Sequence, residues 1–207
     1  SRDICRSLIS MDKFDVKIWP VRWGMTPQNA LEEGNPNDEA IIKRLLTKPN
    51  LDRKPDIHFH ITVPNEFEAM GKYNIGITAG LETTITPPTW IEGMNKMNFN
   101  IVPAKFIKEY LEPIKFDKFD QKTKQNIGTI SYERPLEILF EGADTDIYKQ
   151  TKEFSKDLVD ELSPIKEDFC FLFVGHWLQG SLGHDRKDLG MLLKTFLETF
   201  KNKKEVP

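Results

Sequence analysis

Cysteine is scarce in this sequence. Its 207 residues include only Cys5 and Cys170, which belong to no Cys-x-x-Cys or Cys/His spacing of the kind that holds a metal ion. We therefore predict no metal site. Cys170 stands in the apolar run at 169–174, where we expect a buried thiol. Separate thiols of this kind favour a reducing compartment, and we expect a cytoplasmic protein.

Long apolar runs and a strong excess of one charge are also missing. No stretch approaches the roughly 18 consecutive apolar residues of a membrane-spanning helix. We expect no transmembrane segment, and a peripheral membrane contact stays open. The chain has 29 basic and 32 acidic residues, which leave a net charge of −3. This balance is a poor basis for gripping a nucleic-acid backbone, so we expect no nucleic-acid binding.

Apolar residues are plentiful instead, at 39% of the chain with 14 phenylalanines. Short apolar runs alternate with segments in which apolar residues recur every three or four positions. This alternation predicts an α/β fold with parallel βαβ units. The expected strands are 15–21, 55–63, 73–79, 98–103, 135–142 and 169–174. The expected helices open the chain, begin at Asn35-Pro36 and near Pro88, and cover 104–113, 151–162 and 189–200.

Local residue patterns predict a helix start at 35–39 and a surface loop at 115–126. At 35–39, a capping Asn, a proline at the first helical position and two acids in the first turn predict a helix start. At 115–126, the polar, lysine-rich near-repeat KFDKFDQ predicts a solvated surface loop.

A domain boundary is expected near Gly142–Asp144, after the predicted strand at 135–142. Because the chain opens inside a predicted helix and stops shortly after another, we expect a piece of a longer protein.

The stretch FLFVGHWLQGSLGHDRKDLGMLLKTFLETF combines a predicted strand, a glycine-bearing loop and a helix. Unpaired N–H groups and aligned peptide dipoles make a helix start attractive to anions. Gly175 lets the loop approach a ligand closely. Arg186 and Lys187 add two positive charges beside the helix start, which points to a phosphate or diphosphate. The alternative is that both are surface charges paired with Asp185 and Asp188.

Two further candidates lie near the carboxyl ends of predicted strands, where open α/β sheets bind ligands. His60 is close to the end of the strand at 55–63, and Glu82 lies in the loop after the strand at 73–79. Both could grip hydroxyl groups of a ligand. The alternatives are a hydrogen-bonded structural histidine and a plain surface acid.

Three stretches together resemble GT-B-type glycosyltransferases (glycosyl transferases group 1, family 4-like). The strand, loop and helix quoted above are similar to the first such motif of the family's C-terminal domain. The segment LEILFEGADTDIY at 136–148 resembles its interdomain segment, with Glu141 in place of the usual Asn. The run at 74–109 resembles a strand, helix, strand and helix of the N-terminal domain, and PDIHFH at 55–60 is similar to the segment before it.

The resemblance implies two Rossmann-like domains. They are an acceptor-side domain with a parallel sheet at 1–134, incomplete at its start, and the beginning of a nucleotide-sugar-binding domain at 135–207, which is truncated. The implied reaction moves a sugar from a nucleotide-diphosphate donor to a hydroxyl of an unknown acceptor, with retention and with no cofactor. Gly175, Arg186 and Lys187 would hold the donor diphosphate. The catalytic candidates on this interpretation are His60 and Glu82.

The sequence departs from the family pattern at two points. Many members have a histidine after the strand that corresponds to 73–79, where this chain has Ala79-Gly80-Leu81. The family's paired glutamates fall in a part of the C-terminal domain that this sequence does not contain, so we expect an incomplete donor pocket. The alternative function is a non-catalytic Rossmann-like module that binds a sugar nucleotide or another anion.

Overall fold

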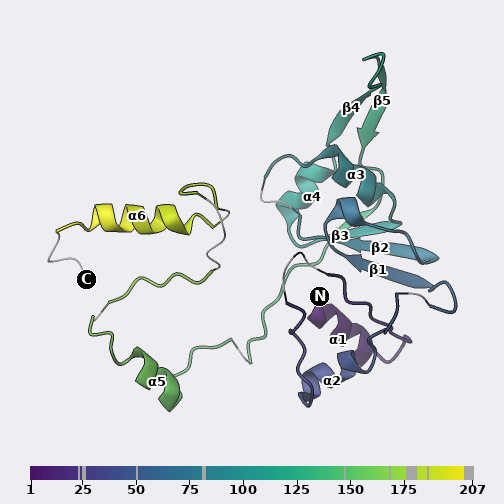
Figure 1. Cartoon of the computed structure of the whole chain (residues 1–207). Helices are drawn as coiled ribbons and strands as arrows, with labels where there is room; N and C mark the ends of the chain where they lie inside the picture. The colour runs from purple at the N-terminus through teal and green to yellow at the C-terminus, as the bar shows by residue number, and fades with distance from the viewer. Residues whose placement is uncertain are drawn as a thin grey trace. The chain divides into compact units, whose positions relative to one another are not determined.

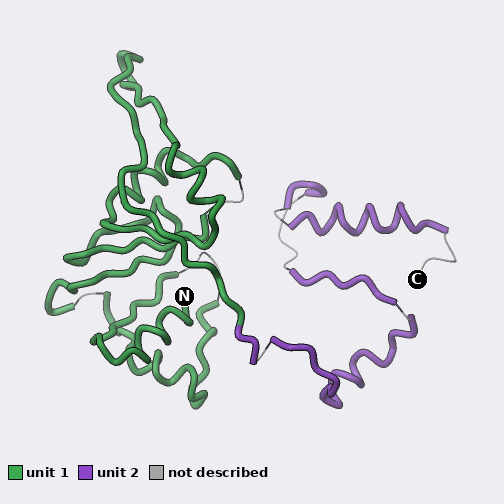
Figure 2. The backbone as a smooth tube through the Cα atoms, turned by 180° about the vertical axis from the view of Figure 1, so that it is seen from behind, with its two compact units in different colours: residues 1–143 green, residues 144–207 purple. Residues whose placement is uncertain are grey.

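A computed structural model describes residues 1–22, 24, 27–49, 51–80, 83–146, 148–167, 169–175, 181–185 and 187–202. The chain divides into two compact units, Ser1–Ala143 and Asp144–Pro207, which Figure 2 shows in different colours. Within the described ranges, no helix has the length and apolar character needed to cross a bilayer.

A four-stranded parallel sheet forms the centre of unit 1 (Figure 1). Its strands, in spatial order, are β1 (Ile57–Ile61), β2 (Tyr73–Ile77), β3 (Phe99–Val102) and β6 (Leu136–Ile138). This sheet confirms the predicted α/β class with parallel strands. The expected first domain ended at 134, before β6, whereas unit 1 includes this strand and ends at Ala143.

The crossovers follow the predicted order of elements. The 3-10 turn η1 (Pro64–Glu66) lies between β1 and β2, helix α3 (Pro88–Asn95) between β2 and β3, and helix α4 (Lys105–Leu111) after β3. Helix α3 packs directly on η1. The two backbones are so close that a Cβ atom at Gly93 would overlap the carbonyl oxygen of Pro64.

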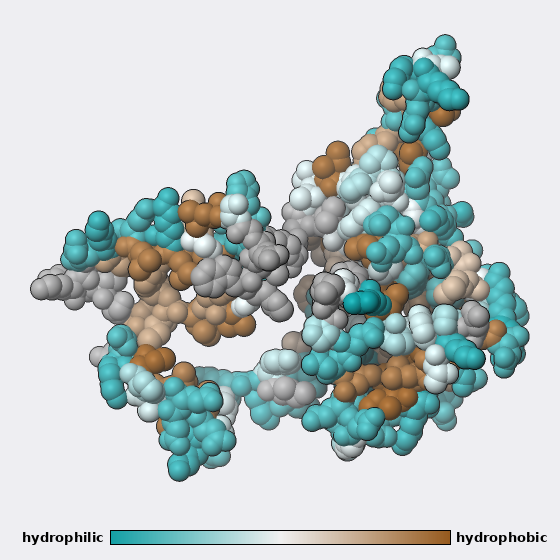
Figure 3. Space-filling view, in the orientation of Figure 1, coloured by the Kyte–Doolittle hydropathy of each residue, from teal (hydrophilic) through white to brown (hydrophobic). Residues whose placement is uncertain are grey.

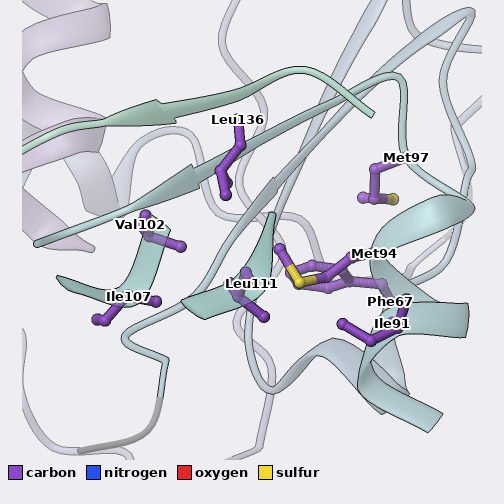
Figure 4. Packing of buried hydrophobic residues seen from close by; sticks show 8 residues of the cluster. All are labelled: Phe67, Ile91, Met94, Met97, Val102, Ile107, Leu111 and Leu136. Atoms are coloured by element: carbon purple, nitrogen blue, oxygen red, sulfur yellow. The ribbon is translucent and has the colours of Figure 1, made fainter. Parts of the chain in front are cut away.

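The core of unit 1 lies between the sheet and these two helices (Figure 4). Burial of each such side chain stabilises the fold by about 1.5–3 kcal/mol. The cluster consists of Phe67, Ile91, Met94, Met97, Val102, Ile107, Leu111 and Leu136. The face of the sheet that contacts this cluster also carries polar and small residues. Among them, Gly76 leaves room for the ring of Phe67 and the side-chain amide of Asn100.

Two short helices complete the start of unit 1: α1 (Arg2–Ser10) and α2 (Pro36–Ile42). An ion pair joins them, with Arg6 Nη2 2.7 Å from Asp38 Oδ1. The Asn35 side chain accepts the Asn37 backbone N–H at 3.0 Å, which confirms the predicted capped start. The strand expected at 15–21 does not form. In this segment Ile18 alone pairs with another residue as in a sheet, through a single parallel bridge to Leu45.

The surface loop predicted at 115–126 is wrong. This segment belongs to an antiparallel hairpin of β4 (Lys115–Phe119) and β5 (Asn126–Ser131). Phe116 pairs with Ile130, and both pack against the core cluster. The strand pattern is hidden in the sequence because the side chains around these two residues are charged or polar and exposed.

Unit 2 contains helices α5 (Lys156–Leu162) and α6 (Leu189–Thr199). The segment expected as a buried strand, 169–174, has no ladder partner in the described part of the chain, and the prediction of a buried Cys170 is wrong because this thiol is exposed. A strand needs hydrogen-bonded neighbours, which this segment lacks. Its Phe171 ring instead packs edge-on against Phe196 of α6, at 5.5 Å between centroids. The second Rossmann-like domain therefore stays a prediction.

Candidate functional site

The carboxyl ends of the parallel strands meet at one edge of the sheet in unit 1. Open α/β sheets bind their ligands at this edge. Two buried threonines extend the ladder past the strand ends: the N–H of Thr62 donates to Ile77 O and the N–H of Thr78 donates to Ile101 O, both at 3.2 Å. A threonine therefore directly follows each of the strands β1 and β2 at this edge.

The first part of the edge is the turn after β1. Thr62 Oγ1 donates to Glu66 Oε2 at 2.7 Å, which fixes the η1 turn above the end of the strand. The carboxylate of Glu66 is on an exposed residue. This arrangement places the exposed Glu66 carboxylate, which can accept hydrogen bonds from ligand hydroxyl groups, at the end of the edge strand.

The second part is the loop that follows β2. Gly80 has a φ of +71°, and a Cβ there would lie 2.8 Å from side-chain atoms of Ile107 in α4. Its N–H donates to Thr78 Oγ1 at 3.3 Å. Only glycine fits this position without strain, since both the backbone angle and the space exclude a side chain.

Thr86 ends this loop just before α3. The residue is only 3% exposed, and its Oγ1 has no hydrogen-bond partner. A buried hydroxyl without a partner is costly, so an internal water or another polar group is expected to satisfy it. Thr86 follows an isoleucine in the sequence, as Thr62 and Thr78 do. The sequence prediction did not use this repeated pattern.

His60 lies on the helix-covered face of β1 and is half-buried. Its Nδ1 accepts the backbone N–H of Glu68 at 3.1 Å, and its ring centroid is 5.9 Å from that of Phe67. Burial lowers the pKa of His60, which favours a neutral ring with its proton on Nε2. Only Nε2–H is thus free to donate to a ligand.

The residues predicted to bind a diphosphate belong to unit 2. Gly175 ends the extended segment, where a Cβ would approach the Phe173 ring to 2.7 Å. Lys187 is exposed and precedes α6, and its backbone N–H donates to Asp185 Oδ1 at 2.9 Å. Arg186 of the same pair, and Glu82 of unit 1, lie outside the described residues.

The alternative interpretation of the basic pair required ion pairs with neighbouring acids. Asp185 accepts the backbone N–H of Lys187, and Asp188 is the N-cap of α6 with a φ of 50°. Among the residues on either side of Arg186 that the structure describes, no ion pair joins the Lys187 ammonium to either aspartate. The Lys187 cation is therefore available to an anionic ligand.

The unit 1 edge offers hydrogen-bonding groups of two kinds, the exposed Glu66 carboxylate and the half-buried, uncharged imidazole of His60. Both suit a ligand with hydroxyl groups, whereas Thr62, Thr78 and Thr86 are buried. No group of three or more His, Cys, Asp or Glu residues with metal-binding geometry occurs in the described ranges. Comparisons with models of protein families, with curated proteins and with solved structures found no match for this chain.

Proposed function

We propose that the chain is part of a nucleotide-sugar glycosyltransferase of GT-B type that moves a sugar to an acceptor hydroxyl with retention. The observation that carries the proposal is the fold of 74–109, the run that resembles the N-terminal domain of this family. It covers all but the first residue of β2, then α3 and β3, and the first five residues of α4, with the two strands parallel and adjacent. The resemblance and the local architecture thus agree along this run.

The proposed division of tasks follows the chemistry of the two units. In unit 2, Gly175, Arg186 and Lys187 hold the donor diphosphate, since guanidinium and ammonium groups bind phosphate oxygens strongly. As the glycosidic bond breaks, negative charge grows on the leaving phosphate. The two cations would stabilise this charge more in the transition state than in the bound donor, which accelerates the reaction.

The acceptor or the transferred sugar would be bound at the carboxyl edge in unit 1. The free Nε2–H of His60 is a hydrogen-bond donor, and Glu82 would supply an acceptor on the neighbouring loop. These roles are hydrogen-bonding roles toward hydroxyl groups. The proposal needs no metal, because the two cations serve the leaving phosphate.

Nucleotide binding tests the proposal. Isothermal titration calorimetry with UDP, GDP and ADP should show binding of at least one of them to the chain. In the Arg186→Ala, Lys187→Ala variant we expect affinity to fall about tenfold or more for each lost contact, because charge-assisted hydrogen bonds contribute roughly 1.5–3 kcal/mol. The matched control is Lys194→Ala with Lys201→Ala, which removes the same charge from the middle of α6 and from the turn that follows it. Equal affinity in both double variants would contradict the proposal.

Turnover separates this proposal from the non-catalytic binding module. Donor hydrolysis or transfer to simple alcohols, followed as release of the nucleoside diphosphate, is expected to accompany binding in a form of the protein with a complete donor pocket. Binding with no release in such a form would favour the module.

A further inference from the structure

The β4–β5 hairpin extends away from the body of unit 1 (Figure 1). A two-stranded hairpin is marginally stable alone, so its base must be anchored. Phe116 and Ile130 pack on the core, and Lys118 Nζ lies 3.8 Å from Glu92 Oε1 of α3. The hairpin is thus a fixed projection whose base belongs to the folded unit.

Asn95 ties the hairpin to the edge of the sheet opposite the candidate site. Its Nδ2 donates to Ser131 O at 2.8 Å, and its Oδ1 accepts the N–H of Glu133 at 3.0 Å. Asn95 ends α3, which returns the chain to the amino end of β3. The base of the hairpin therefore lies near the amino ends of the strands, and the projection leaves the carboxyl edge uncovered.

The distal half of the hairpin exposes two large apolar side chains. Phe119 is 55% and Ile127 is 57% exposed. The ladder shifts register here, because Phe119 pairs with Asn126 and Ile127 is the next residue along β5. The surrounding surface is mainly hydrophilic, with hydrophobic residues among the polar ones (Figure 3). Nothing in the described part of the chain covers these two side chains.

The turn that joins the two strands carries two lysines, Lys122 and Lys124. The Asp120 carboxylate accepts the N–H groups of Lys122 and Thr123 at 2.9 and 2.7 Å, which ties the acid into the turn. Lys122 and Lys124 are exposed, and neither has an ion pair with any described residue. The segment 115–131 has four lysines and two aspartates, a net charge of +2 on a chain whose net charge is −3.

The combination favours an anionic bilayer over other partners. Two side chains are far too small for a stable protein interface, which buries roughly 800 Å² on each partner. A bilayer accepts single apolar side chains at its interface, while lysine stems extend beside them toward the head groups. Each lysine near an anionic leaflet adds electrostatic attraction, which the positive hairpin of this acidic chain can use.

We propose that the β4–β5 hairpin is a peripheral contact for an anionic membrane surface. Phe119 and Ile127 enter the interface, and Lys122 and Lys124 meet the anionic head groups. The contact is separate from the proposed sugar transfer, because it uses the opposite edge of unit 1.

Vesicle sedimentation with the whole chain tests the contact. We expect binding to vesicles that contain phosphatidylserine, little binding to vesicles of phosphatidylcholine alone, and release at high salt, where charges are screened. The Lys122→Gln, Lys124→Gln variant should lower the partition coefficient about tenfold or more. The control Lys149→Gln, Lys152→Gln makes the same charge change in unit 2 and should leave binding unchanged.

A second pair of variants tests the apolar part. Phe119→Ser should weaken vesicle binding severalfold, whereas Phe140→Ser, at an 80% exposed phenylalanine outside the hairpin, should not. Phe119→Trp keeps a large apolar side chain at this position, so it should bind vesicles as the unchanged chain does. On phosphatidylserine vesicles its tryptophan emission should shift to the blue.

Three outcomes would overturn the membrane contact. They are equal binding to both kinds of vesicle, loss of binding in the control variants as large as in the hairpin variants, and loss of oligonucleotide binding in the lysine variant with vesicle binding unchanged. Circular dichroism of each variant shows whether the fold is retained, and Phe119→Trp keeps the test decisive if Phe119→Ser unfolds.

Discussion

Glycines in unit 1 mark where the backbone of one element touches another. Gly93 of α3 faces the Pro64 carbonyl, and Gly76 of β2 faces the Phe67 ring and Asn100 Oδ1. Asn100 is fully buried, and its Nδ2 donates to Met94 O and to the Tyr132 hydroxyl, each at 3.0 Å. These residues decide how closely α3 can approach the sheet. Sequence patterns did not predict them, because the contacts join segments distant in the chain.

Replacing Gly93 tests this close approach. Gly93→Ala should lower the free energy of unfolding by about 1–3 kcal/mol, because the added methyl group forces α3 away from η1. Urea denaturation followed by circular dichroism measures the change. Gly142→Ala is the matched control, since a Cβ there has open space around it, and it should change stability little. Equal stability of the two variants would contradict the packing described for α3.

The histidines on β1 predict a pH dependence. Burial lowers the pKa of His58 and of His60, and mutual repulsion lowers that of His58 further. Because the unfolded chain binds these protons more readily, the stability that they contribute is complete above about pH 6.5 and falls as the pH drops through the lower folded pKa values. Protonated His60 would also lose its acceptor for the Glu68 N–H.

Denaturation midpoints at several pH values between 8 and 5 measure this effect. The wild-type midpoint should fall over this range, and His58→Gln with His60→Gln should flatten the fall. Carboxylates with lowered pKa values, such as Asp38, act only at more acidic pH. A wild-type midpoint that rises on acidification in this window would contradict the neutral, half-buried placement of the two histidines.

The helices and strands that were predicted correctly have a recognisable pattern within their own residues. Helix α2 begins where Asn35 and Pro36 predict it. Strands β1, β2 and β3 lie within the segments expected as strands, although each includes polar or small residues among the apolar ones. The β4–β5 hairpin was missed because its core contacts are few and most of its remaining side chains are charged or polar. The segment 169–174 was misjudged because burial depends on neighbouring strands, which a local apolar run cannot reveal.

The cap of α2 gives a prediction at this scale. Asn35→Ala should lower the free energy of unfolding by about 1 kcal/mol, because the N–H of Asn37 loses its partner. Asn37→Ala is the control, since the contacts of Asn37 at this site are made by its backbone. Thermal denaturation of the three proteins compares them, and a larger effect at Asn37 would contradict the capping role.

The two units differ in how much of their apolar surface is buried. All eight residues of the core cluster belong to unit 1, whereas α5 and α6 bury no residue fully. In α6, Leu197 is 67% exposed. A segment with little buried apolar surface opens easily and contributes little stability of its own.

Limited proteolysis tests this difference across the whole molecule. Trypsin or chymotrypsin should cut within unit 2 first and leave a resistant product that ends near Ala143, because cleavage requires local opening. Mass spectrometry of the early products identifies the cut sites. Early cuts inside the parallel sheet, with α6 left intact, would contradict the assignment of the stable core to unit 1.

The carboxyl edge as the location of the candidate site could be predicted from the order of strands and loops. The contacts at that edge, such as Thr62 to Glu66 and Gly80 to Ile107, could not, because they depend on turn geometry and on packing against α4. The proposed diphosphate site in unit 2 rests on the exposed Lys187 beside the start of α6 and on the family resemblance.

Nuclear magnetic resonance of the isotope-labelled chain during titration with UDP-, GDP- and ADP-sugars tests the proposed donor site most directly. The proposed function predicts shifts of the backbone amides of Gly175 and Lys187 at lower ligand concentration than any change in the β4–β5 hairpin. No shift at these two amides with any donor, or shifts confined to other parts of the chain, would contradict it.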